Sequence, residues 1–385
     1  MNNLSKKNIR LFQPSVDSRE LDKVKEVIDR AWLGGGPLVS NFEEAWSKHI
    51  GSEVSVALNS CTAALHLALL CQNFPRGKKV LVPSMTFAST AVAPLYCGLE
   101  PVFVDSNKDT LGMCIDDLKN KYDKDCVAVI PVHLGGHPVE MEKLVPWARE
   151  KKLLIIEDCA HTSGSNYKGT NLGMWGDIGC YSFEEKKIMA TGDGGMICTN
   201  NPSKLNNIRA HRWIGMDKDN WKTAKEYVSV NRDAMHWFYE ISVLGYKYNM
   251  NDLAAALGIV QLEKLEDMNS IRKTLMLRYC NGIKKIKGVD ALMPYQPNKY
   301  VYWFFGIKTL LRDELMIYLK SKGIATGCHY TPLHHQPLFR QYKSQCPVSE
   351  RAYDSFMTLP FHTSLTNDDI DYILSHLSEF SKKNY

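Results

Sequence analysis

The sequence lacks the features that mark several large classes of protein. No apolar run reaches the roughly 20 residues of a membrane-spanning helix, and the N-terminal segment has no signal-peptide apolar core. The 47 basic and 42 acidic residues are spread along the chain, without the cluster that a nucleic-acid arm or a polybasic membrane patch requires. We therefore expect a protein that binds neither nucleic acid nor membranes.

The cysteines also lack a pattern that would indicate disulfides or a metal site. The chain has 11 cysteines, an odd number, with no CxxC pair. Most lie in apolar runs, which is typical of buried free thiols in a reducing compartment, and we expect a cytoplasmic protein. His334 and His335 are adjacent, but no carboxylate or cysteine stands near them at ligand spacing, so the sequence predicts no metal site.

The order of predicted elements indicates an α/β protein. Helical periodicity covers 18–31 and 41–49, with a glycine-rich break at 34–37 between them. Short β-rich apolar runs then alternate with helical segments. The runs are 54–57, 79–82, 101–104, 126–131, 153–157, 178–183 and 196–199. This alternation is typical of a sheet that helices cover on both faces.

The later part of the chain predicts a second, smaller domain. An aromatic-rich helical stretch is expected at 213–239, and a long helix at 251–279 leads into the C-terminal region. With 385 residues, the chain is long enough for one large and one smaller domain. We place the boundary near residue 265, which gives domains 1–265 and 266–385.

Polar residues that follow two of the predicted strands are candidates for a ligand site, because α/β sheets bind ligands at strand ends. The segment NSCTAALH at 59–66 opens a helix, where free N–H groups and the Thr62 hydroxyl favour an anion. A plain helix cap is the alternative. Asp158 directly follows a buried predicted strand. The alternative is that Asp158 is only a turn residue.

A third candidate is the lysine pair Lys186 and Lys187, which follows the strand-end residue Ser182. The glycine-rich segment TGDGG at 191–195 comes next and allows a tight backbone turn. Lysine pairs are ordinarily solvated surface charge. In a pocket, however, a lysine amine can react with an aldehyde and can carry a proton between two atoms.

Taken together, these motifs resemble the DegT/DnrJ/EryC1/StrS family of pyridoxal 5'-phosphate (PLP) dependent nucleotide-sugar aminotransferases over nearly the whole chain. The matching segments are CTAALHL at 61–67, PSMTF at 83–87, PVHL at 131–134, EDCA at 157–160, GDIGCYSF at 176–183, TGDGG at 191–195 and GCHY at 327–330. The resemblance implies PLP-dependent transferase fold type I, with a mixed, mostly parallel sheet and a smaller C-terminal α/β domain. It also implies a homodimer with shared active sites.

The resemblance further implies roles for individual residues. Lys187 would be the catalytic Schiff-base lysine, because the family lysine stands five residues after a serine, here Ser182. Asp158 would keep the pyridine nitrogen protonated, and Phe87 would stack on the ring. The other implied cofactor contacts are Cys61, Thr62, Ala63, His161, Ser182 and Lys247. His329 and Tyr330 would lie near the sugar.

The chain departs from the family pattern at four places. Glu184 stands where the family usually has histidine, and Gly135 where it often has tyrosine. His161 replaces a common glutamine that binds the ring hydroxyl. The segment GYKYN at 245–249 replaces a frequent Asn-Tyr-Arg pattern that reaches the partner subunit's phosphate, where Lys247 could serve as a point-charge contact.

The activity implied by the resemblance is transfer of an amino group, with glutamate as donor, to a nucleotide-linked keto-deoxy sugar. Such products enter surface polysaccharides such as O-antigen, or glycosides. Similarity to perosamine-type enzymes at 213–218 and 245–249 favours amination at the 4-position over the 3-position. A sugar dehydratase of the family is an alternative that Lys187 disfavours, because that subgroup has histidine there. A lyase and a cofactor-free scaffold protein are further alternatives.

Overall fold

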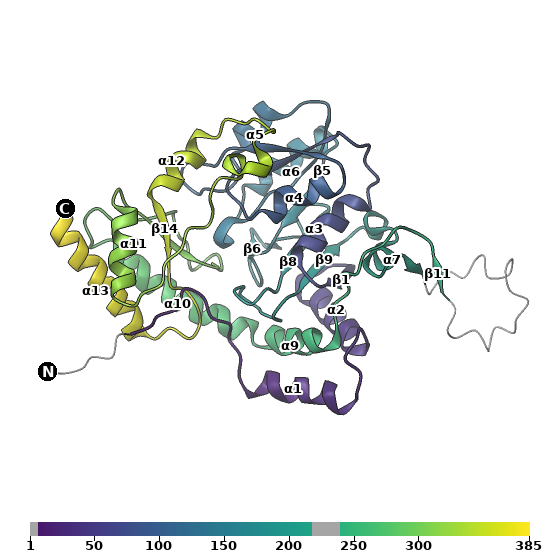
Figure 1. Cartoon of the computed structure of the whole chain (residues 1–385), viewed down its shortest axis with the longest axis horizontal. Helices are drawn as coiled ribbons and strands as arrows, with labels where there is room; N and C mark the ends of the chain where they lie inside the picture. Colours follow the sequence, from purple (N-terminus) through teal and green to yellow (C-terminus); the bar gives the residue numbers. More distant parts are fainter. Residues whose placement is uncertain (1–6, 218–238) are drawn as a thin grey trace, which may run out of the picture.

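The computed structural model describes residues 7–217 and 239–385. Its centre is a seven-stranded sheet with the order β1-β9-β8-β5-β4-β2-β3 (Figure 1). The strands are β1 (Val54–Leu58), β2 (Lys79–Pro83), β3 (Glu100–Val104), β4 (Cys126–Val129), β5 (Leu154–Asp158), β8 (Ile178–Ser182) and β9 (Gly195–Thr199). β9 is antiparallel to both neighbours, whereas the pairs β2–β3, β2–β4, β4–β5 and β5–β8 are parallel. The predicted mixed, mostly parallel sheet is confirmed.

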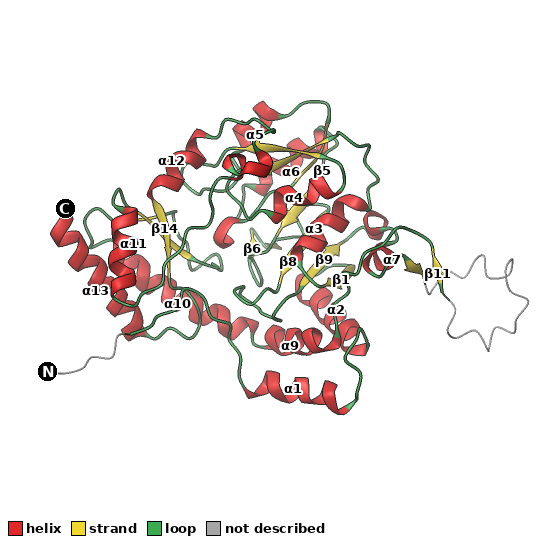
Figure 2. Cartoon of the chain, in the orientation of Figure 1, coloured by secondary structure: helices red, strands yellow, loops and turns green. Residues whose placement is uncertain are grey.

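Both faces of this sheet are buried by helices, as the apolar runs predicted. In β2, Leu81 belongs to one hydrophobic cluster, whereas its neighbours Val80 and Val82 belong to another. Alternate side chains of a strand point to opposite faces, so the two clusters lie on the two sides of the sheet. The helices of this region are α2 (Pro37–Ile50), α3 (Cys61–Leu70), α4 (Ser89–Tyr96), α5 (Ile115–Lys121), α6 (Met141–Glu150) and α7 (Ile208–Arg212). Figure 2 shows the helices around the strands.

Helix α2 begins four residues before its predicted start. Its N-cap residue is Gly36, which has no side chain to bind the free N–H groups of the first turn. The carboxylate of Asp252 takes that role from a distant part of the chain, accepting from the N–H groups of Gly36 at 2.8 Å and Val39 at 3.2 Å. The early start therefore depends on a tertiary contact. Helix α1 (Ser18–Asp29), in contrast, carries its own capping box of Asp17 and Glu20.

Two predicted helices differ in the structure. The helix predicted at 251–279 is two helices, α9 (Asp252–Glu263) and α10 (Leu265–Ile283), interrupted at Lys264. The ammonium group of Lys264 is buried and contacts Ser15 O at 3.0 Å and Glu20 Oε1 at 2.8 Å, which ties this junction to α1. Of the stretch predicted at 213–239, residues 218–238 lie outside the described residues.

Residues 213–217 and 239 are the described parts of the helical stretch predicted at 213–239, and they are not helical. Instead, β10 (Met216–Asp217) pairs with β11 (Glu240–Ile241) as a short antiparallel ribbon. The helical prediction is therefore wrong for 213–217. A second small pair, β6 (Asn166–Tyr167) and β7 (Thr170–Asn171), follows β5.

The C-terminal part of the chain forms its own antiparallel sheet of β12 (Asp290–Ala291), β13 (Phe305–Lys308) and β14 (Phe356–Leu359). It gathers with α10, α11 (Arg312–Ser321) and α13 (Asn367–Asn384) at one end of the molecule (Figure 1). α12 (Pro347–Ser355) precedes β14. The position of the domain boundary near residue 265 stays a prediction.

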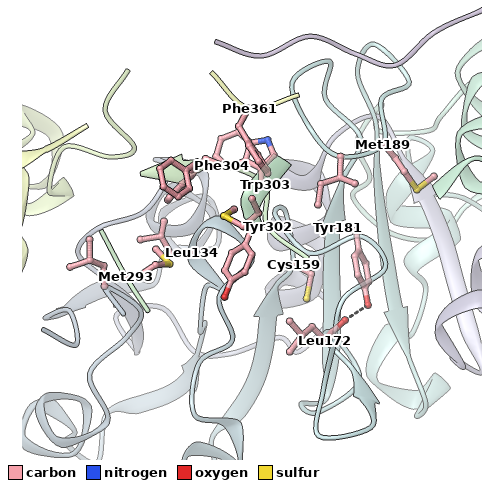
Figure 3. Close-up of a cluster of buried hydrophobic side chains, with 14 of the residues drawn as sticks. Leu134, Cys159, Leu172, Tyr181, Met189, Met293, Tyr302, Trp303, Phe304 and Phe361 are labelled. Atoms are coloured by element: carbon pink, nitrogen blue, oxygen red, sulfur yellow. Dashed lines mark hydrogen bonds between the residues drawn. The ribbon is translucent and has the colours of Figure 1, made fainter. Parts of the chain in front are cut away.

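Aromatic side chains fill the contact between the central sheet and the C-terminal region. Figure 3 shows Tyr302, Trp303 and Phe304 lying among Leu134, Cys159 and Phe361. Trp303 and Phe304 are 2% and 0% exposed. Burial of such large apolar surfaces contributes strongly to stability and holds the two parts of the chain together.

Two further findings concern the cysteines and the helices. All 11 cysteines are free thiols, and most of them are buried, as the sequence predicted. Within residues 7–217 and 239–385, no helix has both the length and the apolar character needed to cross a bilayer.

Candidate active site

A cavity of about 370 Å³ lies at the carboxyl ends of β5 and β8 and at the start of α3. Nine of the eleven residues predicted for the site line it. They are Cys61, Thr62, Phe87, Asp158, His161, Ser182, Lys187, His329 and Tyr330. The position agrees with the rule that α/β sheets bind ligands at the carboxyl ends of their parallel strands. Ala63 and Lys247 do not line the cavity.

Lys187 is the buried member of the lysine pair. Burial lowers the pKa of its ammonium group to about 8, although the carboxylates of Glu184 and Asp158 oppose this change. Its Nζ lies 4.1 Å from the centre of the Trp303 ring. The side chain of Lys186 is 55% exposed and lies 3.6 Å from the Glu184 carboxylate. With this pKa, the amine of Lys187 is neutral in roughly one molecule in ten at pH 7.

Asp158 ends β5 with its carboxylate inside the cavity. The Thr90 hydroxyl donates to Oδ2 at 2.8 Å, and the Ala160 N–H donates to Oδ1 at 3.1 Å. Burial nevertheless raises the pKa of this carboxyl group, because too few partners replace its water. A cation in the cavity would stabilise the ionised carboxylate. Thr90 was not predicted, since nothing in its sequence context indicates that it reaches a strand 68 residues away.

The start of α3 provides hydroxyl groups to the cavity. Thr62 Oγ1 and Ser89 Oγ are 2.6 Å apart in a hydrogen bond, and both residues line the cavity. The N–H of Ala63 donates to Ser60 Oγ at 3.1 Å, so Ser60 is the N-cap of this helix. For the segment 59–66, the sequence allowed either a helix cap or a ligand site. Ser60 is a helix cap, whereas Thr62 faces the cavity. Ser89 was missed because it opens a helix with no strand directly before it.

Cys61 is the first residue of α3 and is buried. Burial raises the pKa of its thiol well above the usual value, and the nearby Asp158 carboxylate adds to this change. The thiol is therefore uncharged. Ser182 ends β8 and is 6% exposed, and its Oγ accepts from the N–H of Glu184 at 3.4 Å.

His161 is held as a neutral imidazole in one orientation. Its Nδ1 accepts the N–H of Gly135 at 3.3 Å, so in the neutral ring the proton is on Nε2. Burial lowers the pKa of the ring well below its usual value, and the positive charge of Lys187 adds to this effect. Nε2 lies 3.4 Å from the Tyr330 hydroxyl. His161 is thus a hydrogen-bond donor toward the cavity.

Gly135, one of the departures from the family pattern, permits this arrangement. Its backbone has φ of +63°, a region that other residues rarely adopt. A Cβ at this position would lie 2.7 Å from the ring of Phe304. Gly135 therefore does not open space in the cavity. It allows Phe304 to approach the backbone that binds His161.

Trp303 is a cavity residue that the sequence did not reveal. Its ring is parallel to that of His161 at 4.0 Å, and its Nε1–H donates to the carbonyl of Lys186 at 2.6 Å. It thereby contacts both His161 and the segment that carries Lys187. Nothing in the aromatic run YWFF at 302–305 indicated that one of its rings would reach the cavity.

Three aromatic residues line the open side of the cavity. Phe87 is 57% exposed, and its ring lies 5.8 Å from that of Tyr330. His329 Nδ1 is 3.0 Å from Thr358 Oγ1, and burial lowers the pKa of His329 to about 4. Phe87 precedes His329 and Tyr330 by more than two hundred residues, so the cavity forms only when the C-terminal region packs on the central sheet.

Lys247 lies outside the cavity of its own chain. Its Nζ lies 5.4 Å from the centre of the Trp213 ring, and the two residues form an isolated β-bridge. The predicted role of Lys247 concerns a second subunit, so within one chain it stays a prediction.

The histidine pair has a neighbour that sequence spacing did not reveal. Glu350 Oε1 lies 2.9 Å from His334 Nε2 and 3.5 Å from His335 Nε2. The expectation that no carboxylate accompanies this pair was therefore wrong, because helix α12 brings Glu350 back to it. His334 Nδ1 also lies 2.7 Å from the buried Ser84 hydroxyl. Both ring nitrogens of His334 thus have protein partners.

Comparisons with known proteins agree with this geometry. The model of the DegT/DnrJ/EryC1/StrS aminotransferase family matches residues 14–378. GDP-perosamine synthase of Escherichia coli O157:H7 is 32% identical over 378 residues, which are 97% of this chain and 99% of that protein.

Two solved structures are similar over almost the whole chain. Aminotransferase TlmJ from Streptoalloteichus hindustanus has a TM-score of 0.88 and 29% identity, covering 96% of this chain and 98% of that chain. The putative sugar aminotransferase Spr1654 from Streptococcus pneumoniae, in its PLP form, has a TM-score of 0.88 and 25% identity, covering 98% and 99%. The resemblance and the fold class predicted from the sequence are confirmed. This chain is an aminotransferase that belongs to the DegT/DnrJ/EryC1/StrS family.

Proposed function

We propose that this aminotransferase uses PLP to transfer an amino group from glutamate to a nucleotide-linked keto-deoxy sugar, at the 4-position. The observation that carries the proposal is the buried amine of Lys187, whose pKa is about 8, in the same cavity as Asp158 and Thr62. Such an amine can attack an aldehyde and can also accept and return a proton near neutral pH.

The residues of the cavity fit PLP. The buried Asp158 carboxylate lacks a full set of partners, and a protonated pyridine nitrogen would supply the missing positive charge. The hydroxyls of Thr62, Ser89 and Ser182 lie at the start of α3, the start of α4 and the end of β8, where a phosphate would also meet the N-terminus of α3. A cavity of about 370 Å³ provides the space. The exposed ring of Phe87 would stack on the cofactor ring.

When bound, PLP supplies an electron sink for the carbon that loses its proton. Lys187 would hold the cofactor and carry the proton between the substrate carbon and the cofactor carbon. His161, which is neutral and has its proton on Nε2, would donate to the ring hydroxyl without adding a charge. Trp303 fixes the orientation of His161 through the parallel contact of the two rings.

The proposed sugar substrate rests on similarity and on the residues at the open side of the cavity. GDP-perosamine synthase is 32% identical over almost the full length of both chains. Together with the segments 213–218 and 245–249, this supports the 4-position. His329 and Tyr330 would contact the sugar there. Amination at the 3-position is the closest alternative, and Lys187 disfavours the dehydratase alternative.

We further propose a homodimer with shared active sites, acting in the cytoplasm in surface polysaccharide or glycoside biosynthesis. In such a dimer Lys247 would contact the phosphate bound by the partner subunit. A lysine is a point charge that suits this role. The exposed apolar residues Ile241 and Leu244, 65% and 83% exposed, lie just before Lys247 and would be covered by the second subunit.

The direct test is to trap the cofactor on the protein. Borohydride reduction of the PLP-loaded protein, followed by peptide mass spectrometry, should place the cofactor mass on Lys187. Lys187→Ala should remove this label and turnover while the protein stays folded, whereas the matched control Lys186→Ala should keep both. Retained transamination in Lys187→Ala would overturn the assignment.

A substrate panel tests the sugar. The purified enzyme, glutamate and a set of 3-keto and 4-keto nucleotide sugars should give more than one equivalent of 2-oxoglutarate per active site only with 4-keto sugars. Turnover confined to 3-keto sugars would show that the positional assignment is wrong while leaving the aminotransferase proposal intact.

A further inference from the structure

A second cavity, here called the Arg272 cavity, lies apart from the active-site cavity. Its volume is about 330 Å³, and it is formed by the segment 164–166, one side of α10 and the segment 297–302. The two cavities share no lining residue. The proposed function uses none of the side chains that line the Arg272 cavity.

Arg272 is the unusual residue of this cavity. It is 3% exposed, its Nη1–H donates to Trp303 O at a long 3.4 Å, and its buried Nε has no partner in the described part of the chain. No ion pair joins Arg272 to a carboxylate among residues 7–217 and 239–385. Burial lowers the pKa of the guanidinium group to about 10. The centre of the Phe361 ring lies 5.5 Å from the guanidinium carbon.

A buried guanidinium without a counter-charge is strongly unfavourable, because burial removes its water and no carboxylate replaces it. A bound anion would supply the missing charge. Guanidinium groups bind carboxylate and phosphate particularly well, since their N–H donors form a planar fork.

The other polar residues of the cavity limit which kinds of anion it can bind. Lys273 and Lys299 add positive charge, and Glu266 is the only acidic residue among the lining residues. The buried Asn269 Oδ1 has no partner in the described part of the chain and can only accept a hydrogen bond. An anion that fits must therefore carry negative oxygens for Arg272 and also a hydroxyl that can donate to Asn269.

We propose that the Arg272 cavity binds a phosphate group, with Arg272 as its main contact. Monohydrogen phosphate has both the negative oxygens and the donor hydroxyl that the cavity requires. The phosphate comes either from inorganic phosphate or from a small phosphate monoester whose organic part carries a hydroxyl, such as glycerol 3-phosphate. Trp303 joins the two cavities, because its carbonyl accepts from Arg272 while its ring lines the active site.

The test is calorimetric titration of the PLP-loaded protein with inorganic phosphate, glycerol 3-phosphate and sulfate in chloride buffer of constant ionic strength. We expect saturable binding of phosphate or its ester, and weaker binding of sulfate, which has no hydroxyl at neutral pH. The tighter of the two phosphate ligands identifies the source. Absence of saturable binding, or equal binding of sulfate and phosphate, would overturn the proposal.

Variants locate the bound phosphate. Arg272→Met should weaken phosphate binding by about ten-fold or more, because a charge-assisted contact is lost. The matched control Arg278→Met changes a half-buried arginine of the same helix that pairs with Asp371 and does not line the cavity, and it should leave phosphate binding unchanged. Lys247→Met should also leave it unchanged, and loss of binding in this variant would place the ion at the active site instead.

A second variant and a stability measurement separate a ligand site from a purely structural arginine. In phosphate-free buffer, Arg272→Met should melt no lower than the wild type, since the unpaired buried charge is removed. If Arg272→Met does not fold, Arg272 has a structural role and the second variant decides. Lys273→Met changes a lysine at the exposed edge of the cavity, and it should still weaken phosphate binding. Unchanged phosphate binding in Lys273→Met would then overturn the proposal.

Discussion

Replacing Lys187 by methionine should stabilise the cofactor-free protein at neutral pH. The folded state buries the Lys187 ammonium group, and burial lowers its pKa from the usual 10.5 to about 8. Below pH 8 both the folded and the unfolded chain carry the proton, so the folded state bears the full desolvation cost. Methionine has a similar length and no charge, so it removes this cost.

The size of the effect follows from the two pKa values. A pKa of about 8 in the folded state and 10.5 in the unfolded state corresponds to about 3 kcal/mol. The attractions of Glu184 and Asp158 are already included in the folded-state pKa, so the expected gain stays at about 3 kcal/mol. With an unfolding entropy of about 2.1 cal/mol/K per residue, this gain raises the melting temperature by about 3–4 °C.

The sign of the pH dependence is part of the prediction. Between pH 8 and 10.5 the folded wild type releases the Lys187 proton, while the unfolded chain keeps it, so wild-type stability rises with pH. The advantage of Lys187→Met should therefore be largest below pH 8 and disappear near pH 10.5. Loss of the Lys187 charge also raises the pKa values of Asp158 and His161.

Melting curves of cofactor-free wild type, Lys187→Met and Lys186→Met, recorded at one protein concentration from pH 6 to pH 10.5, measure the effect. Lys186→Met is the matched control, because its side chain is 55% exposed and should change stability by less than about 0.5 kcal/mol. The reasoning is refuted if Lys187→Met melts below the wild type at pH 7. A gain that does not depend on pH would refute it too.

Three further substitutions test the structure around the site. In Gly195→Ala the new Cβ would lie 2.3 Å from the Ser60 backbone, so titration with PLP should show weaker binding, and unfolding by urea a loss of about 1–3 kcal/mol. Glu157→Ala leaves three backbone N–H groups without their acceptor and should cost about 3–5 kcal/mol by the same assay. Trp303→Phe keeps a ring but loses the bond to Lys186 O, which should cost about 1 kcal/mol in melting experiments.

Each of these has a result that would count against it. Wild-type PLP affinity in Gly195→Ala would mean that β9 and α3 can separate without disturbing the cofactor site. Wild-type stability in Glu157→Ala would mean that water replaces the carboxylate. A loss in Trp303→Phe as large as that in Trp303→Ala would mean that the indole N–H, rather than ring packing, dominates.

Much of the fold was predictable because its signals are local. Strands buried on both faces read as continuous apolar runs, and each of the seven predicted runs corresponds to one strand of the central sheet. The positions of Thr62, Asp158 and Lys187 directly after or near strand ends made them candidates, and the resemblance to the family selected them. The family spacing from Ser182 distinguished Lys187 from Lys186.

Other features could not be predicted, because they depend on partners far away in the sequence. The start of α2 depends on Asp252, more than two hundred residues away. Glu350 reaches His334 only through the packing of α12. Neither contact leaves a spacing or a periodicity that a single sequence could reveal.

By itself, then, the sequence determined the order of strands and helices, the family and the side chains that can carry amino transfer, since these depend on local pattern and residue type. Only the tertiary structure decided which lysine is buried, which nitrogen of His161 carries the proton, and that Trp303 and Arg272 face cavities. The physical reason is that burial, pKa and hydrogen-bond partners arise from contacts between distant segments, which exist only once the chain has folded.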